Sequence, residues 1–286
     1  MVGHNGLKLR MMVAMSILFG FYAALAGVIF FTFGTGTGVL AVVLLGSLLF
    51  VGFQYKFGKW MALRSVGAED MPEHSEGRYP YAELHRSTEK LSDEMGIDKP
   101  RLMVADMGVP NAFAVGRKGA GVVVISREIM QILEYDELEG VLAHELAHIK
   151  NRDVVIMVLG QSIASMIGIV VQWAVIIGGD RNIATYLIAM VAGTIAQMIV
   201  MIFVMAISRY REYVADSDAA EYTRNPEAMA RALEKISSVG QGKEMRGEDS
   251  VSALCIFGGE RGLLATLFAT HPPTEKRIAQ LRGFSP

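Results

Sequence analysis

Four long apolar stretches divide this chain, and each is long enough to cross a lipid bilayer. None contains a charged residue; they cover Met11 to Phe33, Val39 to Phe53, Val154 to Gly179 and Asn182 to Ser208. About 20 residues of α-helix, each rising about 1.5 Å, span a hydrocarbon core. The second stretch reaches this length when the flanking residues 34–38 and 54 share the boundary. The pattern therefore predicts four transmembrane helices.

The first stretch follows Lys8 and Arg10, as the core of a secretory signal follows basic residues. Its apolar length exceeds that of a typical signal core, and a second predicted span follows almost at once. We therefore interpret it as a retained anchor.

Basic residues gather at one end of every predicted span. They are Lys8 and Arg10, then Lys56, Lys59 and Arg64, then Lys150 and Arg152, and finally Arg209 and Arg211. The connections at the opposite ends contain the uncharged segment GTGTG and the pair Asp180 and Arg181. Short loops rich in Lys and Arg stay in the cytoplasm. The chain is therefore predicted to be a multi-pass protein of the cell (inner) membrane, with both termini and all aqueous residues on the cytoplasmic side.

The composition agrees with a membrane protein. Hydrophobic residues make up 52% of the 286 residues and charged residues 20%, whereas soluble domains usually contain about 25% charged residues. The net charge of −2 and the lack of a basic tract give no reason to expect a nucleic-acid partner. Cys255 is the single cysteine, which excludes an internal disulfide framework and a cysteine-rich zinc cluster.

The aqueous residues form two segments that together contain roughly 175 residues, enough for the core of one ordinary domain. The predicted organisation has four parts. An N-terminal transmembrane hairpin (1–55) precedes the first part of the aqueous domain (56–153). A second transmembrane hairpin (154–208) precedes the second part of that domain (209–286).

Local patterns predict helices around a small sheet. The spacing of apolar residues indicates a helix over 81–96 that ends at Gly96. Short strands are expected in RLMVAD (101–106), NAFAVG (111–116) and GVVVIS (121–126), with a glycine-rich turn between the last two. The predicted class is α+β: a mainly helical integral membrane protein whose aqueous domain carries a small sheet.

Capping residues mark the helices that follow. Ser126 is expected to cap a short helix through Leu133, and Asp136 is expected to form a capping box with Glu139 for the next helix. In the second aqueous segment we expect a helix over 209–223 that continues the fourth span, another over 226–239, and a last one in PTEKRIAQL (273–281). The residues 240–260 are rich in glycine and are expected to form a loop.

The segment HELAH, residues 144–148, lies directly before the third span. His144 and His148 are four residues apart, so on a helix both imidazoles project from one face and can bind one zinc ion. Glu145 lies beside them, where a carboxylate can take a proton from a water activated by zinc. The alternative is a helix whose histidines are only capped or solvated. The remaining histidines outside the late HPP segment, His4, His74 and His85, receive no role.

A catalytic zinc needs a third protein ligand, and Glu212 is the best candidate. Asp216 lies four residues later on the same helical face, where it can accept a hydrogen bond from a ligand histidine. The 63 residues between His148 and Glu212 are almost all two spans and a short turn, which return the chain to the side of the membrane that it left. The alternative is an exposed carboxylate paired with Arg209.

These features together resemble the HtpX family of membrane zinc metalloproteases, relatives of the CaaX prenyl proteases. The resemblance covers nearly the whole chain: two spans, a strand-bearing segment, HELAH, two more spans, REYVAD (211–216) and a late HPP (271–273). It implies a gluzincin-like protease domain with one zinc ion per chain, held by His144, His148 and Glu212. It also implies that Glu145 is the general base and that Asp216 supports a ligand from behind.

Two further segments match the family. NAFAVG resembles the edge strand that binds substrate, which implies that Asn111, Ala112 and Phe113 bind an extended peptide through main-chain hydrogen bonds. The alternative is a turn into a core strand. THPPTEKRIAQL (270–281) resembles the late motif, which implies that His271 and Arg277 lie near the zinc, where either can stabilise an oxyanion. The alternative is a helix start with Arg277 in a surface ion pair.

The spacing of the ligands from the spans predicts where the zinc lies. Along a helix, His148 is about 9 Å from Val154, and Glu212 is about 6 Å from Ser208. The zinc is therefore expected at the cytoplasmic membrane surface. The predicted function is a zinc endopeptidase that cuts misfolded proteins or membrane proteins there, in protein quality control and the stress response, with the lipid bilayer as its other partner.

Three alternatives stay open. One is a narrow processing protease that acts on prenylated C-termini, although such relatives are usually longer and have more spans. Another is an intramembrane protease, although those enzymes place the zinc motif inside a span. The third is a non-catalytic membrane adaptor that keeps zinc to hold its fold, although structural sites favour closed, cysteine-rich shells. Replacement of Glu145 separates the adaptor from an enzyme.

Overall fold

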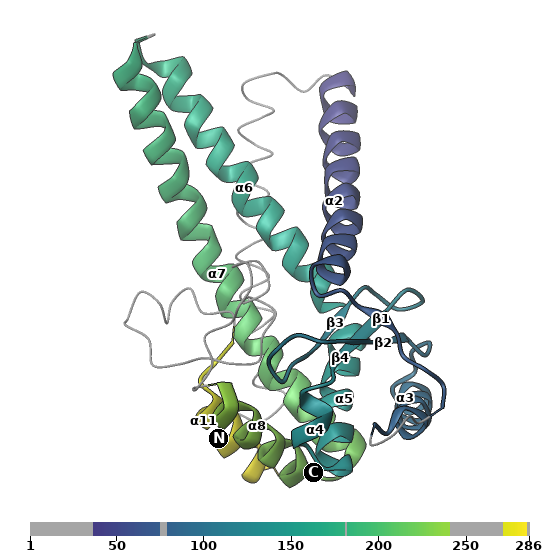
Figure 1. Ribbon diagram of the computed structural model, residues 1–286. Helices are drawn as coiled ribbons and strands as arrows, with labels where there is room; N and C mark the ends of the chain where they lie inside the picture. The colour runs from purple at the N-terminus through teal and green to yellow at the C-terminus, as the bar shows by residue number, and fades with distance from the viewer. Residues whose placement is uncertain (1–36, 75–78, 181, 241–270, 285–286) are drawn as a thin grey trace.

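A computed structural model describes residues 37–74, 79–180, 182–240 and 271–284 (Figure 1). Three long helices, α2 (Thr37–Ser65), α6 (Asp153–Gly178) and α7 (Ile183–Thr223), project from one end of a body of shorter helices and a small sheet. We call this part, including the last turns of α7, the helix–sheet body. The first predicted span and residues 241–260 of the predicted loop lie outside the described residues.

The sheet has four strands in the order β1-β2-β4-β3. They are β1 (Glu69–Asp70), β2 (Arg101–Ala105), β3 (Ala112–Val115) and β4 (Val122–Ser126). β2 and β4 are parallel, whereas β3 and β4 form an antiparallel hairpin. The hairpin requires Gly116, because its φ is 110° and a Cβ there would collide with the carbonyl oxygen of Ala120. The three predicted strands are confirmed, and β3 lies at an edge of the sheet.

The helices of the body match the predicted ones. They are α3 (Tyr81–Met95), α4 (Ile129–Ile132), α5 (Tyr135–Lys150), α8 (Pro226–Gly240) and α11 (Thr274–Arg282). α3 ends at Gly96, whose φ of 64° is left-handed, as the sequence predicts. α4 begins after Glu128 rather than directly after the predicted cap Ser126, although Ser126 Oγ accepts the N–H of Ile129 at 3.1 Å. α7 is one helix of 41 residues, which confirms that the fourth span continues beyond residue 208.

The predicted capping box at the start of α5 is wrong. The helix begins two residues earlier, after Glu134, and Glu137 accepts the N–H of Glu134 at 2.9 Å. Asp136 therefore already lies inside the first turn. Glu139, the other member of the predicted box, accepts a hydrogen bond from Ser87 of α3 at 3.0 Å. The carboxylate of Glu139, which the local spacing predicts to cap the helix, thus binds another helix instead.

One hydrophobic core joins the two aqueous segments. α5 lies at its centre, with Leu142 and Leu146 packed in the same buried cluster as Met229 and Leu233 of α8. Gly140 allows this close approach, because a Cβ there would lie 3.3 Å from the backbone of Met229. Each buried aliphatic side chain stabilises the fold by about 1.5–3 kcal/mol. The helix that carries HELAH therefore packs against residues that precede the α6–α7 hairpin in the sequence and against residues that follow it.

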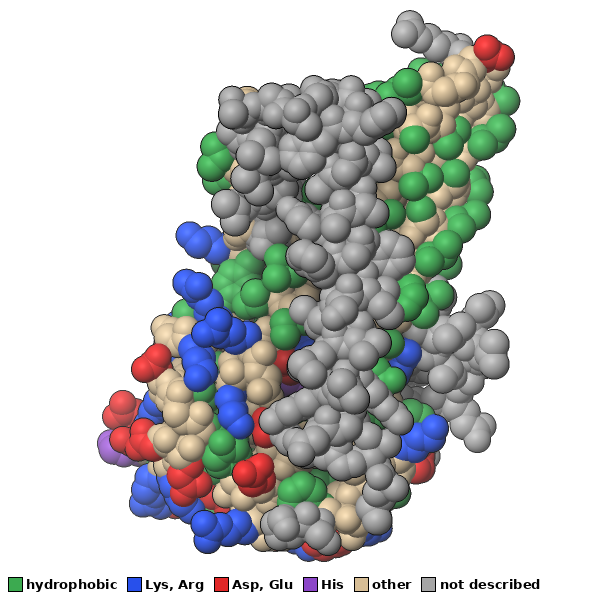
Figure 2. Space-filling model, turned by 180° about the vertical axis from the view of Figure 1, so that it is seen from behind, with side chains coloured by type: hydrophobic (Ala, Val, Ile, Leu, Met, Phe, Trp, Pro, Cys, Tyr) green, Lys and Arg blue, Asp and Glu red, His purple; other side chains and the backbone are tan. Residues whose placement is uncertain are grey.

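α6 and α7, which contain the third and fourth predicted spans, are long and apolar enough to cross a membrane. They pack tightly where Gly168 meets Gly193; a Cβ on Gly193 would lie 2.6 Å from the carbonyl oxygen of Gly168. Their outer surfaces expose large apolar side chains, among them Trp173, Leu187 and Ile199, and Figure 2 shows this apolar surface along the long helices. α2 contains the second predicted span. An apolar surface of this size suits lipid rather than water.

The path from α5 to α6 differs from the predicted one. Asn151 and Arg152 form a turn, and Arg152 adopts a left-handed conformation with φ 58°. The expected helical distance from His148 to Val154 is therefore wrong, because the helix ends at Lys150. The turn brings Asp153, the first residue of α6, back towards the end of α5.

Candidate metal centre

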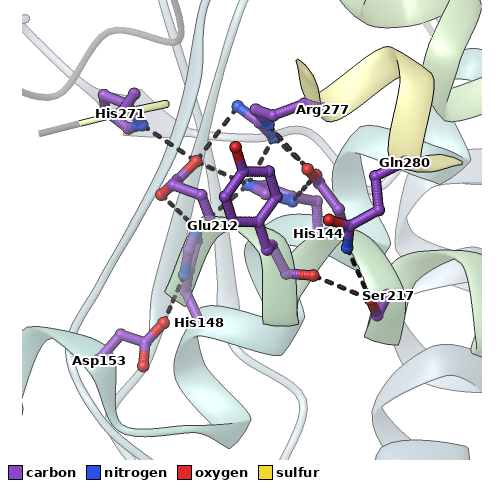
Figure 3. Close-up of polar contacts among 10 residues, drawn as sticks. His144, His148, Asp153, Glu212, Ser217, His271, Arg277 and Gln280 are labelled. Atoms are coloured by element: carbon purple, nitrogen blue, oxygen red, sulfur yellow. Dashed lines mark hydrogen bonds and ion pairs between the residues drawn. The ribbon is translucent and has the colours of Figure 1, made fainter. Parts of the chain in front are cut away.

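Three of the predicted residues converge where α5 meets α7 (Figure 3). His144 Nε2 and His148 Nε2 lie 3.1 Å apart. A carboxylate oxygen of Glu212 lies 3.6 Å from His144 Nε2, and the other lies 3.5 Å from His148 Nε2. One ligand atom from each of these three side chains lies within 4.8 Å of the other two, which is the spacing of a metal site.

The distances fit a zinc ion. Bonds of about 2.0–2.1 Å in a tetrahedral site separate the ligand atoms by about 3.3 Å. The three observed separations lie on either side of this value. In addition, His144, His148 and Glu212 offer two imidazole nitrogens and one carboxylate oxygen within reach of one point. These are ligand types that zinc takes in proteins, so the donor set suits a divalent metal.

Each histidine is held from behind by a carboxylate. Asp216 Oδ1 lies 3.0 Å from His144 Nδ1, and Asp153 Oδ2 lies 2.6 Å from His148 Nδ1. When a ring is neutral, a proton on its Nδ1 leaves the lone pair of Nε2 directed to the shared point. The structure thus places Asp216 where the sequence predicts it, beside one of the two candidate ligand histidines.

Asp153 is a member of the site that the sequence analysis did not assign. It is buried, and its second oxygen lies 2.9 Å from Nε of Arg211, which pairs its charge. The left-handed turn at Arg152 directs it back to His148. A signal was available in the sequence: a carboxylate at the first position of an apolar helix is costly unless it is paired.

The late HPP segment and α11 bring a histidine and an arginine to the same carboxylates. His271 Nδ1 and Arg277 Nη1 lie 3.0 and 3.2 Å from Glu212 Oε2. Arg277 also donates to Asp216 through Nε at 2.8 Å and through Nη2 at 2.7 Å. The alternative of a surface ion pair for Arg277 is wrong, because this residue is 1% exposed. An exposed Glu212 paired with Arg209 is equally wrong, because Glu212 is 3% exposed.

The network sets the charges of the site. Burial raises the pKa of Glu212, but the charges of His271 and Arg277 outweigh it and hold this pKa well below its ordinary value. Burial likewise raises the pKa of Asp216, and the charge and hydrogen bonds of Arg277 lower it further than burial raises it. Both carboxylates are therefore ionised. Burial lowers the pKa of His144, but hydrogen bonds with Asp216 and Glu212 outweigh it and raise this pKa to about 9.

Glu145 follows His144 on α5 and is buried. Its charge is one of three, after those of Asp216 and Glu212, that raise the pKa of Arg277 against the opposing effect of burial. The glutamate of HELAH thus belongs to the same charged cluster as the three candidate ligands.

The predicted substrate strand, β3, packs against α5, the helix that carries HELAH. The side chains of Asn111, Ala112 and Phe113 are buried. Asn111 pairs with Ser126 through its carbonyl, which accepts the Ser126 N–H at 2.9 Å, and its own N–H donates to Ser126 Oγ at 3.0 Å. β3 is an edge strand, as binding of an extended peptide would require, and its side chains also pack in the core, as the alternative of a core strand predicts.

Comparison with known proteins identifies clear relatives. Residues 79–285 match the family model for peptidase family M48. A protein named Protease HtpX homolog from Halobacterium salinarum is 52% identical, over 96% of this chain and 100% of that protein. Another of the same name, from Pyrococcus furiosus, is 36% identical over 97% of this chain and 96% of that protein. The crystal structure of S. mikatae Ste24p is similar in fold, with a TM-score of 0.59 at 17% identity, over 96% of this chain and 66% of that chain.

Replacement of Asp153 by Asn should weaken zinc binding. The change removes the charge that holds the His148 ring, and loss of such a partner typically costs about 10–100-fold in metal affinity. Competition with a chromophoric chelator measures the affinity. Asp180→Asn, at the exposed far end of α6, is the matched control and should bind zinc like the parent. Equal affinity in the two variants would contradict a positioning role for Asp153.

Zinc binding should depend on pH through His144. The raised pKa keeps a proton on His144 at neutral pH, and that proton must leave before the ring binds metal. The apparent affinity should therefore rise about tenfold per pH unit up to about pH 9 and then level off. Titrations between pH 6.5 and 9.5, corrected for the chelator, test this. Asp216→Asn should move the break to lower pH, whereas a flat profile would exclude His144 as the titrating ligand.

Proposed function

The chain belongs to peptidase family M48, and on this premise we propose that it is a zinc-dependent endopeptidase of the cell membrane. The observation that supports this most directly is the convergence of His144, His148 and Glu212, with Glu145 beside them, at the base of long apolar helices. We propose that it cuts misfolded or membrane proteins at the cytoplasmic membrane surface, in protein quality control and the stress response.

The proposed chemistry assigns a task to each side chain. His144, His148 and Glu212 would hold one zinc ion, which, when bound, supplies Lewis-acid activation of water and of the substrate carbonyl. Glu145 takes a proton from the attacking water as the new C–O bond forms, and gives it to the amine nitrogen as the C–N bond breaks. Asp216 and Asp153 keep the two imidazoles in the tautomer that presents Nε2.

His271 and Arg277 are both proposed to lie beside the reacting carbonyl, and their contacts favour different tasks. Arg277 directs two of its nitrogens to Asp216 and a third towards Glu212, so it mainly holds these carboxylates in place. The His271 side chain is 19% exposed, and its Nδ1 lies 3.0 Å from Glu212. We therefore propose His271 as the group that stabilises the developing oxyanion.

β3 is proposed to bind substrate by adding an extended peptide to the sheet. Because the carbonyl of Asn111 faces β4, the alternation of an antiparallel ladder turns the backbone groups of Ala112 and Ala114 away from it, towards the open edge. A peptide on that edge would pair with main-chain groups, while Asn111 is proposed to bind the peptide backbone at the start of the strand. Recognition of main chain rather than side chains gives little sequence selectivity, which suits a protease of misfolded proteins.

The location follows from the same proposal. The basic residues beside each predicted span favour the cytoplasm for the helix–sheet body. The contact between Asp153 and His148 supports a metal centre directly at the start of α6. A processing protease for prenylated C-termini is the second candidate, since the fold is similar to that of Ste24p, although this chain covers 66% of that chain.

Replacement of Glu145 by Gln should abolish peptide hydrolysis and leave zinc bound. Loss of a general base typically costs about 10²–10⁴-fold in rate. Detergent-purified parent and variant would be stripped with a chelator, given zinc and incubated with unfolded casein, with fragments followed on a gel and zinc measured by mass spectrometry. Glu221→Gln, at an exposed position of α7, is the control.

The outcomes separate the candidates. Cleavage by the parent and the control alone supports the protease and its base together. Equal cleavage by all three would reject Glu145 as the base and indicate a contaminating protease. If none cleaves casein, a prenylated peptide distinguishes a narrow processing protease from a non-catalytic adaptor.

Replacement of Ala114 by Pro tests the edge strand. Proline removes an N–H that faces away from β4, and edge strands tolerate it. Loss of about one hydrogen bond to the substrate should raise KM by about threefold to tenfold, with zinc content unchanged. Ala114→Ser, which keeps the N–H, should behave like the parent. An unchanged KM in the proline variant would argue against binding along β3.

A further inference from the structure

A separate cavity lies where α2 passes the start of α6. Its volume is about 290 Å³, and it is lined by Gly52, Tyr55, Lys56, Arg117, Val155 and Val158. The lining residues come from α2, from the turn between β3 and β4, and from the first turns of α6. They include none of the metal-centre residues and none of the residues of β3.

The polar part of the cavity is positively charged. The side chains of Lys56 and Arg117 are exposed, and neither forms an ion pair with an acidic side chain in the described part of the chain. The Tyr55 hydroxyl is buried and has no hydrogen-bond partner among those same residues. Two cations and a buried hydroxyl group around one space favour an anionic ligand rich in oxygen atoms.

The other part of the cavity is apolar. Gly52 lies in the second predicted span and Val155 and Val158 lie in the third, so the cavity crosses the border between apolar helix and basic residues. Beside Gly52 there is room for a ligand, since a Cβ there would meet none of the described residues within 4 Å. In Figure 2, basic side chains gather directly below the apolar surface of the long helices on the side where α2 joins the body.

We propose that this cavity binds an anionic phospholipid. The lipid phosphate lies between Lys56 and Arg117, and the Tyr55 hydroxyl donates to a phosphate or ester oxygen. An acyl chain extends past Gly52 and along Val155 and Val158 between α2 and α6. The charge of the polar part fits the head group, and the apolar part fits the chain at the depth where a bilayer places each.

Such a lipid would connect three separate parts of the fold. It would join α2 to α6 and to the β3–β4 turn, where Arg117 lies two residues after the end of β3. Binding should therefore stabilise the position of α2 against the helix–sheet body. The proposal does not depend on protease activity, and its test measures binding and thermal unfolding.

The test is native mass spectrometry of the full chain in detergent, titrated with dioleoylphosphatidylglycerol, with dioleoylphosphatidylcholine and with glycerol 3-phosphate. We expect the anionic lipid to bind at least tenfold more tightly than the zwitterionic one. Lys56→Gln and Arg117→Gln should each weaken it by about fivefold, and the double variant by about 25-fold, since each cation near a membrane surface contributes a factor of this size. Tyr55→Phe should weaken it less.

Two matched controls change the same residue types far from the cavity. Lys90→Gln and Arg86→Gln alter exposed positions on α3 and should leave the lipid affinity unchanged. The anionic lipid should also raise the Tm of the parent and of the controls but not of the double variant, whose Tm without lipid reports that it is folded.

Three results would overturn the proposal. Equal affinity for the anionic and the zwitterionic lipid would mean that the cavity does not recognise the charge of the head group. An equal loss of lipid affinity in the cavity variants and in the control variants would show that the lipid responds only to general surface charge. Binding of glycerol 3-phosphate as tightly as the lipid would identify a site for small anions instead.

Discussion

Two imidazoles on one turn of α5 face one carboxylate of α7, and the contacts around these three side chains explain most of the architecture. The histidines present Nε2 to a common point because carboxylates hold both Nδ1 atoms. Those carboxylates are buried and need charged partners of their own, since an unpaired buried charge costs several kcal/mol. Arg277 pairs with Asp216, and Arg211 pairs with Asp153. The site is thus a closed set of compensating charges in which each member requires the others.

This requirement links distant parts of the chain. α5 supplies the histidines, α6 supplies Asp153, α7 supplies Glu212, Asp216 and Arg211, and α11 supplies Arg277. The long hairpin of α6 and α7 therefore does more than connect two aqueous segments, because its residues nearest the body contact both candidate ligand histidines. The hydrophobic core around Leu142 and Leu146 fixes α5, so the charged groups assemble on a rigid helix.

The β3–β4 hairpin has a place in both proposals. Its edge strand lies beside α5, where a substrate peptide would pair with main-chain groups, and its turn carries Arg117 to the cavity next to α2. Gly116 makes this turn possible through its left-handed backbone. One small hairpin thus contributes to both proposed binding sites.

The sequence by itself determined the features that depend on short spacings between residues and on runs of apolar residues. The four-residue spacing of His144 and His148, the apolar lengths of the helices and the strand patterns are local properties. The structure has the corresponding elements within the residues that it describes, and the first predicted span lies outside them. Pairing HELAH with Glu212 relied on one long-range argument, that two spans return the chain to the side it left, and the structure brings these residues together. The tertiary structure alone decided which charges pair. Asp153 contacts His148 because the chain turns at Arg152. Glu139 accepts a hydrogen bond from α3 instead of capping its own helix. Arg277 binds a buried aspartate instead of an acidic residue on the surface. Such pairings depend on distances between segments far apart in the chain, which sequence spacing does not encode.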